Sequence, residues 1–446
     1  MARRLSVSIA LRPDRDVAVL FATRGVRLFA YGLISVVLVL YLAAAGLPDR
    51  RIGALLTGTL LGDAAISLWM TTRADRLGRR RMLVAGAGLM LVAAAAFTAS
   101  RSFWLLVIAA VVGVISPAGS EVGPFLAIEQ AALSQRVEAT RRVGVFAWYS
   151  LTGSIATALG ALSGGALSGA LQGRGVSEVA SYRFVILAYG ALGLVLGVLF
   201  TRLTGAVEAT GSLDAPSVAE APDSVEAPAT LEPPAGDRSA PAPTPRATWA
   251  GGVLGLRRSR AIVLHLSLLF SLDAFAGGFI VQSLVAWWFH RKFGAPPAVL
   301  GWIFFGGNLL AGVSALSAGW LARRIGLVNT MVFTHLPSNL LLIAVPFMPT
   351  LPLAIAVLLA RFSISQMDVP TRQAYVMAVV DPAERAAAGG VTGIARTIGA
   401  SLAPAAAAPL FASGGLSAVP FVVSGGLKIV YDLLLYRGFR SERPRR

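Results

Sequence analysis

The 446-residue chain contains no cysteine, only three histidines and few charged residues. Without cysteine it can form neither disulfide bonds nor a thiolate metal site. The histidines are scattered, and the sequence has neither a phosphate-binding Gly-Lys-Ser/Thr loop nor a nucleotide-binding unit. We therefore expect no enzyme, no cofactor, no resident metal and no ATP-driven activity.

Charged residues make up 14% of the chain, against about 25% in an average soluble domain. Hydrophobic residues make up 56%, and the mean hydropathy is +0.71. Apolar runs long enough to cross a bilayer recur throughout the chain. They predict an all-α integral membrane protein with twelve transmembrane helices, at residues 17–45, 52–72, 82–100, 103–131, 143–169, 182–203, 260–289, 298–322, 328–348, 352–380, 387–412 and 417–437.

The formal net charge of +17 has two explanations, nucleic-acid binding or membrane topology. If both termini face the cytoplasm, 26 of the 39 basic residues lie on the inner side, seven lie outside and six fall within spans. This asymmetry is what the positive-inside rule predicts. We expect a multi-pass protein of the inner or plasma membrane with cytoplasmic termini, and no nucleic-acid partner.

The segment between the sixth and seventh predicted helices differs in composition from the rest. Residues 204–247 hold eight of the 24 prolines and seven of the 22 acidic residues. Such a segment cannot bury enough apolar surface to fold. We predict a mostly disordered cytoplasmic linker, 204–259, between an N-terminal bundle, 17–203, and a C-terminal bundle, 260–437, with cytoplasmic tails at 1–16 and 438–446.

The two predicted bundles resemble each other in sequence. A shift of 248 positions superposes Gly53 on Gly301 and Gly58 on Gly306, and a shift of 247 places Glu121 opposite Asp368. Two six-helix repeats around a linker suggest a transporter whose site lies between the halves near the midplane. The first span ends in three alanines, as a cleaved secretory signal does, but its counterpart in the second half favours a retained span.

The loop after the second predicted helix, Asp75-Arg76-Leu77-Gly78-Arg79-Arg80-Arg81, resembles the signature of the major facilitator superfamily. The resemblance implies a secondary transporter that acts as a monomer by alternating access. It also implies that this loop is a conformational latch, formed by Asp75, Arg76, Gly78, Arg79 and Arg80. The glycine usual four residues before the aspartate is Thr71 here.

Two further family motifs are altered. Gly160-Ala161-Leu162-Ser163-Gly164-Gly165 is similar to the antiport motif of the fifth helix, with alanine in the proline position. The fourth helix lacks the embedded arginine common in proton-coupled members. The glycines also have a simpler interpretation, which is close helix packing, and we favour it.

Ionisable residues inside a span cost roughly 2.5 to 3.5 kcal/mol each on insertion, so each is a functional candidate. The basic ones are Arg24, Arg27, Arg361, Arg372, Arg396 and Lys428, and the acidic ones are Asp63, Glu121, Glu129, Asp273 and Asp368. Near balance between the two signs suggests pairing.

The tenth predicted helix carries a polar stripe. Its members follow helical spacing, at Arg361, Ser365, Asp368, Arg372 and Tyr375. Asp368 and Arg372 have the order that favours an i,i+4 ion pair. The pair serves either helix packing or substrate and proton binding.

Other candidates stand apart from this stripe. Glu121 follows Pro117 and Gly119, and has no cation in its own helix, so it is a proton-carrier candidate unless it only bonds across helices. Glu129 is placed as a boundary or latch residue. Arg27 and Asp273 are expected on cavity-lining helices, where they pair across the halves or serve structure alone.

Weaker candidates complete the set. Asp63 and Arg396 are charged, and Tyr31, Tyr149 and Tyr375 could contact an amphipathic ligand or simply pack. Trp104, Trp287, Trp288 and Trp320 are expected in the interfacial belt.

The sequence favours proton-coupled export of small organic or toxic compounds, with the bilayer, the substrate and protons as partners. One alternative is uptake of a small anionic metabolite held by Arg27, Arg372 or Arg396. Another is a membrane sensor or scaffold that transports nothing. Fold-level analogy cannot choose among them.

Overall fold

The structure is a computed structural model that describes residues 14–113, 115–119, 125–208, 258–381 and 384–439. Its helices are α1 (Arg15–Ala44), α2 (Asp49–Leu77), α3 (Arg79–Ala99), α4 (Phe103–Val112), α5 (Phe125–Arg136), α6 (Ala139–Gly173), α7 (Glu178–Thr201), η1 (Gly205–Val207), α8 (Arg260–Gly278), α9 (Gln282–Phe293), α10 (Pro297–Ile325), α11 (Leu327–Ala344), η3 (Val345–Phe347), α12 (Leu351–Phe362), α13 (Asp368–Val379), α14 (Arg385–Ala412) and α15 (Val419–Phe439).

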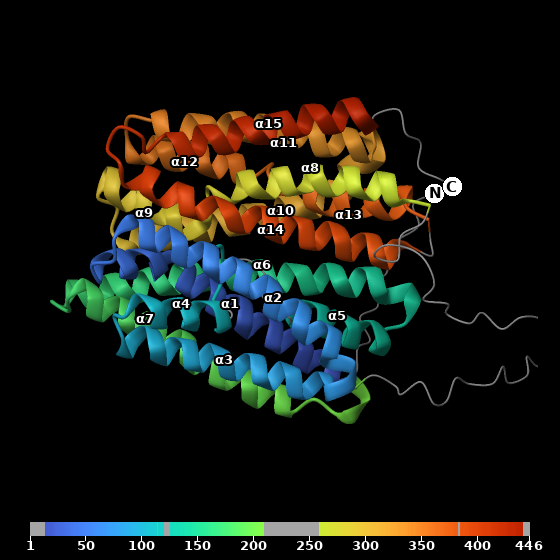
Figure 1. The fold of residues 1–446 in the computed structure, drawn as a ribbon, viewed down its shortest axis with the longest axis horizontal. Helices are drawn as coiled ribbons and strands as arrows, with labels where there is room; N and C mark the ends of the chain where they lie inside the picture. The colour runs from blue at the N-terminus through green and yellow to red at the C-terminus, as the bar shows by residue number, and fades with distance from the viewer. Residues whose placement is uncertain (1–13, 114, 120–124, 209–257, 382–383, 440–446) are drawn as a thin grey trace, which may run out of the picture.

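The predicted twelve-span, two-bundle membrane fold is confirmed. Within the described ranges, ten helical stretches are long and apolar enough to cross a membrane, and α4 and α12 are shorter apolar helices. Helices α1–α7 form one half and α8–α15 the other, lying side by side with their axes roughly parallel (Figure 1). The start of α1 and the end of α15 lie at one end of the bundle, which we call the terminal end (Figure 1). The opposite end, with the connections at 45–48, 174–177 and 413–418, is the loop end.

Three of the twelve predicted spans are broken rather than continuous. The fourth is divided into α4 and α5, the seventh into α8 and α9, and the tenth into α12 and α13. The break in the fourth contains Pro117, which lacks an N–H, and Gly119, whose φ is +65°. The seventh breaks after a glycine pair, Gly277 and Gly278. Irregular backbone at membrane depth is tolerated where it is buried in protein or lines a cavity.

The predicted repeat is visible in the turns that join helices. Gly78 between α2 and α3 has a φ of +96°, and Gly326 at the equivalent turn between α10 and α11 has a φ of +86°. Left-handed backbone of this kind favours glycine, since it has no Cβ. The 248-residue shift therefore matches two glycines that the same turn geometry requires.

The halves meet closely at the loop end. A Cβ on Gly53 of α2 would lie 2.7 Å from the Pro404 carbonyl oxygen of α14, and one on Gly165 of α6 would lie 2.7 Å from the Gly301 Cα of α10. The Ala405 amide also donates to Thr57 Oγ1 at 3.1 Å. Gly53 and Gly301 are the pair that the repeat superposed, so equivalent positions close two related interfaces.

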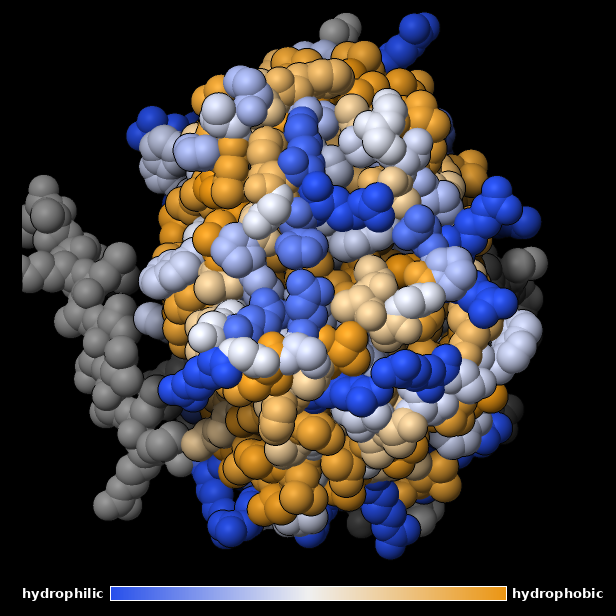
Figure 2. Space-filling model, turned by 90° about the vertical axis from the view of Figure 1, so that its left-hand side faces the viewer, coloured by the Kyte–Doolittle hydropathy of each residue, from blue (hydrophilic) through white to orange (hydrophobic). Residues whose placement is uncertain are grey.

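The surface agrees with a membrane environment. Figure 2, which looks onto the loop end, shows hydrophilic residues across the centre of that face and hydrophobic residues prominent towards its edges. Large side chains such as Leu268, Trp104 and Trp302 are more than half exposed. Trp104 and Trp320 lie near helix ends and are exposed, as predicted for the interfacial belt. The belt prediction is wrong for Trp287 and Trp288, which are buried. Trp288 packs edge-on against Phe421.

Most of the predicted linker, 209–257, lies outside the described residues, as do most of the two predicted tails. Its first residues are folded: η1 packs Val207 into the N-terminal half. The Thr204 hydroxyl donates to Asp16 Oδ2 at 2.6 Å, and Glu208 Oε2 accepts from the Arg79 backbone N–H at 2.6 Å. The helical half therefore extends to Glu208.

Candidate functional site

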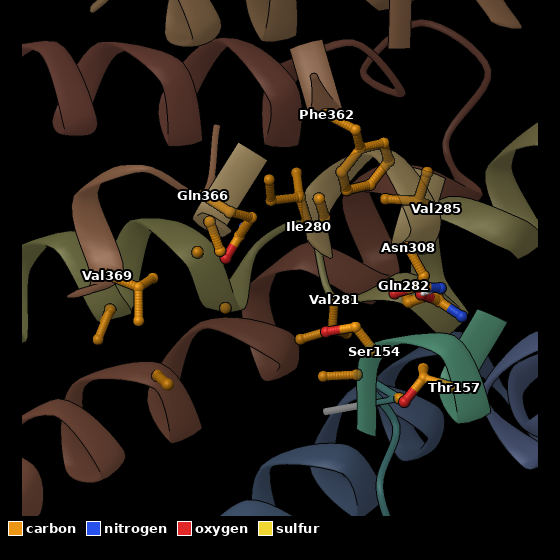
Figure 3. A pocket seen from close by; sticks show the side chains of 18 of the residues that line it. Ser154, Thr157, Ile280, Val281, Gln282, Val285, Asn308, Phe362, Gln366 and Val369 are labelled. Carbon is orange, nitrogen blue, oxygen red and sulfur yellow. Dashed lines mark hydrogen bonds between the residues drawn. The ribbon is translucent and has the colours of Figure 1, made fainter. Parts of the chain in front are cut away.

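A cavity of about 840 Å³ lies between the two halves. Its walls come from α1, α2 and α6 on one side and from α8–α15 on the other. Figure 3 shows Ser154 and Thr157 of α6 across from Val281 and Gln282, with Phe362 and Gln366 on the far wall. The cavity extends towards the terminal end as far as Ser150 and Gly393.

The broken fourth and seventh spans meet on the loop-end side of this cavity. The Ser283 backbone N–H donates to the Pro117 carbonyl at 3.1 Å, and Gln282 Nε2 donates to Ser35 Oγ at 2.7 Å. Asn308 Nδ2 in turn donates to Gln282 Oε1 at 3.2 Å. Carbonyls freed by the breaks are thus satisfied across the halves, and side-chain amides line the cavity.

The N-terminal wall contributes two charged groups, Arg24 and Asp63. Arg24 Nε donates to the Tyr149 carbonyl at 2.6 Å, and its guanidinium lies over the Tyr149 ring at 4.3 Å. It fits there because Gly153 has no side chain: a Cβ at that position would lie 2.9 Å from Arg24 Nε. Asp63 accepts a long contact from Ser67 Oγ at 3.5 Å.

Asp273 is the centre of an ion cluster in the C-terminal wall. Its Oδ1 accepts from Lys428 Nζ at 2.5 Å, and its Oδ2 accepts from Arg372 Nη1 at 3.1 Å. Arg372 Nη1 also donates to Asp368 Oδ2 at 3.0 Å, so the predicted i,i+4 pair is confirmed. All four side chains are at most 9% exposed, and Asp273 and Lys428 face the cavity while Asp368 and Arg372 lie behind it.

A histidine connects this cluster to a third carboxylate. His335 Nδ1 lies 2.9 Å from Asp432 Oδ1, and His335 Nε2 lies 4.0 Å from Asp273 Oδ1. Asn339 Nδ2 donates to the other Asp432 oxygen at 3.0 Å. The contacts from Asp273 through His335 to Asp432 therefore lead from the cavity wall into the interior of the C-terminal half.

The stripe predicted on one continuous helix is divided by the break between α12 and α13. The Ser363 hydroxyl donates to the Ala360 carbonyl at 2.7 Å, a local bond of the kind that competes with helix propagation. Arg361 consequently lies in the last turn of α12, and Asp368 in the first turn of α13. Each charge is at the helix end that its sign favours.

Arg361 and Arg396 line the cavity, and neither has a carboxylate partner among the residues that the structure describes. Arg361 is 8% exposed, and Arg396 is half-buried. Among the described residues, neither guanidinium has a carboxylate oxygen within 4.0 Å, and the Nε atom of each is buried without a hydrogen bond. Arg361 lies over the Phe362 ring at 5.2 Å.

The proposed pairing of Arg27 with Asp273 across the halves is wrong, because each finds partners within its own half. Arg27 Nη2 lies 2.5 Å from Glu129 Oε2, and both side chains are fully buried. Thr23 donates to Glu129 at 3.0 Å, and the Tyr149 hydroxyl donates to it as well. The boundary assignment of Glu129 is therefore wrong too, since α1 packs tightly enough on its neighbours to enclose the pair.

The remaining predicted residues lie at different distances from the cavity. Asp63, Asp273, Arg361 and Arg396 line it, whereas Arg27, Tyr31, Asp368, Arg372 and Tyr375 are buried behind its walls. Glu121 lies outside the described residues. Sequence reasoning missed four groups: Arg24 and Lys428, which were noted only as charges within spans, and His335 and Asp432. Asp432 falls inside a predicted span, which was an available signal.

The predicted latch loop is a surface site away from the cavity. Arg79 Nη1 donates to Gln135 Oε1 at 2.8 Å and to the Val207 carbonyl at 3.3 Å, while Arg80 Nη2 donates to the Thr201 carbonyl at 2.6 Å. Arg76 is exposed. Asp75 lies in α2, and its side chain is outside the described part of the structure.

The glycines of the altered antiport motif pack helices together. A Cβ on Gly160 would lie 2.0 Å from the Phe29 carbonyl oxygen, and one on Gly164 would lie 2.3 Å from the Leu33 carbonyl oxygen. Gly165 faces the other way, against α10, where a Cβ would lie 2.3 Å from the Pro297 carbonyl oxygen. The motif thus joins α6 both to α1 and to the opposite half.

Comparison with known proteins shows which family this chain matches. Residues 20–404, and separately 266–446, match the Major Facilitator Superfamily. The uncharacterized membrane protein YJR124C of Saccharomyces cerevisiae is 30% identical over 425 residues, which cover 95% of this chain and 93% of the yeast protein.

Solved structures of transporters share the fold. The nucleoside transporter NupG, in a mutant form, superposes with a TM-score of 0.71 at 13% identity, over 95% of this chain and 99% of NupG. A bacterial homolog of the human lysosomal transporter Spinster gives 0.70 at 18% identity, over 98% and 99% of the two chains. The D-xylose-proton symporter gives 0.66 at 13% identity, over 94% and 97%. The twelve spans, the two packed halves and these matches establish that the chain belongs to the major facilitator superfamily.

Proposed function

We propose that this protein carries a small organic molecule across the membrane by alternating access, with transport coupled to protons. The observation that supports this most directly is the cavity between the halves, closed by interlocking glycines at the loop end and lined by buried charges from both halves. Rocking one half against the other would close the terminal end and open the loop end around the same residues.

The orientation follows from charge. Basic residues are concentrated in the loops and tails of the terminal end, which by the positive-inside rule is the cytoplasmic side. With both termini in the cytoplasm of a cell whose inner or plasma membrane holds the protein, the structure is an inward-facing state. The predicted linker, 204–259, would then join the two halves on the cytoplasmic side.

Proton coupling is best assigned to Asp273, His335 and Asp432. An imidazole can both accept and donate a proton, and His335 lies between the two carboxylates. The other charged groups around Asp273 are Lys428 and Arg372, with Asp368 beyond them. Loss or gain of a proton at His335 changes the balance of this cluster, and Asp273 and Lys428 carry that change to the cavity wall.

The direction we propose is export of organic or toxic compounds. A second candidate, uptake of an anionic metabolite, is favoured by the basic side chains of the cavity, Arg24, Arg361, Arg396 and Lys428. The two candidates share the site and the mechanism and differ in the direction of net flux.

The test is growth of an efflux-deficient bacterium that expresses the protein, challenged with antibiotics, dyes, biocides and metalloids. Wild type should protect against a subset of compounds, and Asp273→Asn and Asp368→Asn should lose that protection at equal expression. Glu138→Gln, a change of an exposed residue outside the cavity, is the matched control. Protection by wild type and by all variants alike, or by none, contradicts export through this site.

Coupling is tested in proteoliposomes that contain a pH-sensitive dye. A gradient of a compound identified in the growth assay should drive proton movement in wild type. His335→Gln should abolish that movement while exchange of labelled for unlabelled compound continues. Unchanged proton movement in His335→Gln would remove His335 from the coupling path. If the protein alters growth but moves no compound across the membrane, it is instead a sensor or scaffold.

A further inference from the structure

We propose that Arg361 and Arg396 form a binding site for an organic anion in the C-terminal wall of the cavity. The site would hold a carboxylate or a phosphate ester. This inference rests on the proposed function, since the site lies in the same cavity, and it names the class of substrate that the cavity accepts.

The first argument is the charge balance of the wall. Arg361, Arg372, Arg396 and Lys428 are four cations, and Asp273 and Asp368 are the two carboxylates that lie among them. Asp432 is hydrogen-bonded to His335 and Asn339. With Asp432 counted as a third carboxylate and His335 as neutral, the described charged groups of this wall still carry an excess of one positive charge in a protein interior.

The second argument is where that excess lies. Lys428 and Arg372 are bonded to Asp273, and Arg372 is also bonded to Asp368. Among the described residues of this wall, the two guanidiniums with no carboxylate oxygen within 4.0 Å are those of Arg361 and Arg396, and both reach the cavity surface. A buried cation without a counter-charge is costly, so an anion that enters the cavity would relieve it.

The third argument is the chemistry of the donors. A guanidinium presents a planar fork of N–H groups that matches the two oxygens of a carboxylate or phosphate. Gln366 and Thr397 line the same wall beside the arginines. The Thr397 hydroxyl donates to its own helix at the Gly393 carbonyl, which leaves its oxygen lone pairs as acceptors for a substrate hydroxyl.

The fourth argument separates an organic from an inorganic anion. Ile280, Val281, Phe362 and Val369 give the cavity an apolar lining (Figure 3). Its volume of about 840 Å³ is within the range of pockets that enclose whole organic ligands, roughly 300 to 1,000 Å³. A free phosphate ion would fill a small part of it and leave the apolar lining unused.

The experiment measures binding to the full-length protein in detergent by thermal unfolding, followed through its eight tryptophans. The probes are benzoate, succinate and glycerol phosphate, each with an uncharged counterpart (benzamide, succinamide and glycerol), and inorganic phosphate. At least one organic anion should raise the unfolding midpoint in a saturable way, whereas its counterpart and inorganic phosphate should not. The charged group that succeeds tells carboxylate from phosphate ester.

The variants test the residues. Arg361→Gln and Arg396→Gln should each weaken binding of that anion at least tenfold. Arg361→Lys should bind with intermediate affinity, since it keeps the charge and loses the fork. Arg101→Gln, an exposed change at the loop end, is the control. Arg361→Gln should also raise the unfolding midpoint without ligand, because it removes an uncompensated buried charge; an arginine needed only for packing would lower it.

Two results overturn the inference. One is equal stabilisation by the anions and their uncharged counterparts, and the other is wild-type affinity in both glutamine variants. Flux in proteoliposomes is measured separately. Binding of an anion that is never transported contradicts the proposed function and leaves the binding site standing. Transport of uncharged compounds alone contradicts the anion-binding site and leaves the proposed function standing.

Discussion

Lys428 Nζ lies 2.5 Å from Asp273 Oδ1, and this bond joins α15 to α8 at the wall of the cavity. The second oxygen of Asp273 accepts from Arg372 of α13. One buried carboxylate therefore ties together three helices of the C-terminal half. Any movement of these helices during transport has to preserve or exchange these bonds, since an unpaired charge at this depth is costly.

Asp273→Asn is expected to destabilise the protein more than Lys428→Met. The asparagine leaves Lys428 without its counter-charge and Arg372 with Asp368 alone, and breaking a buried pair in this way costs about 3–5 kcal/mol. Lys428→Met leaves Asp273 bonded to Arg372. Unfolding by SDS, followed by tryptophan fluorescence, gives the two free energies. Equal losses in the two variants would show that Asp273 is not the centre of the cluster.

Arg27→Met should reduce stability without changing ligand affinity. Arg27 and Glu129 are fully buried and do not line the cavity, so the substitution strands a carboxylate in the N-terminal half. The expected loss is about 3–5 kcal/mol, and the double variant Arg27→Met with Glu129→Gln should recover most of it. SDS unfolding measures the loss and titration with the bound anion measures affinity. A weakened affinity in a folded Arg27→Met protein would assign Arg27 to the substrate path.

Gly165→Ala should favour the state that is open at the loop end. The new Cβ would lie 2.3 Å from the Pro297 carbonyl oxygen, so α6 and α10 must separate there. Gly173→Ala, with open space on the same helix, is the matched control.

The chain has no native cysteine, so one reporter, Ser154→Cys in the cavity, can be labelled by an impermeant maleimide in right-side-out vesicles. Labelling should increase with Gly165→Ala and stay unchanged with Gly173→Ala. An equally slow reaction in both would mean that Gly165 does not hold the loop end closed.

Glu208→Ala should loosen the start of α3. The Glu208 carboxylate accepts from the backbone N–H groups of Arg79 at 2.6 Å and Arg80 at 3.3 Å, which as the first N–H groups of α3 have no acceptor within the helix. Loss of such a cap costs about 0.5–2 kcal/mol. Hydrogen exchange of the first turn of α3 should accelerate accordingly. Glu138→Ala removes a glutamate before α6 whose side chain makes no capping bond, and it should leave exchange unchanged in both helices.

The sequence predicted what depends on local pattern. Apolar runs gave the spans, and the matched glycines gave the repeat, because a turn with positive φ needs glycine wherever it recurs. The pair of Asp368 and Arg372 was also predictable, since residues four apart on one helix are neighbours in any fold. The break that puts Asp368 at the start of α13 was not predicted, nor was the break in the fourth span.

Only the tertiary structure decided which charges meet. Arg27 is bonded to Glu129, 102 positions away, and Asp273 to Lys428, 155 positions away. These pairs depend on how each helix is rotated and how closely it packs, which the glycine contacts between helices set. The same packing left Arg361 and Arg396 at the cavity with no carboxylate oxygen within 4.0 Å in the described part of the chain. Hydropathy and spacing in one chain determine that a span carries a charge, but they hold no information on the neighbour that will neutralise it.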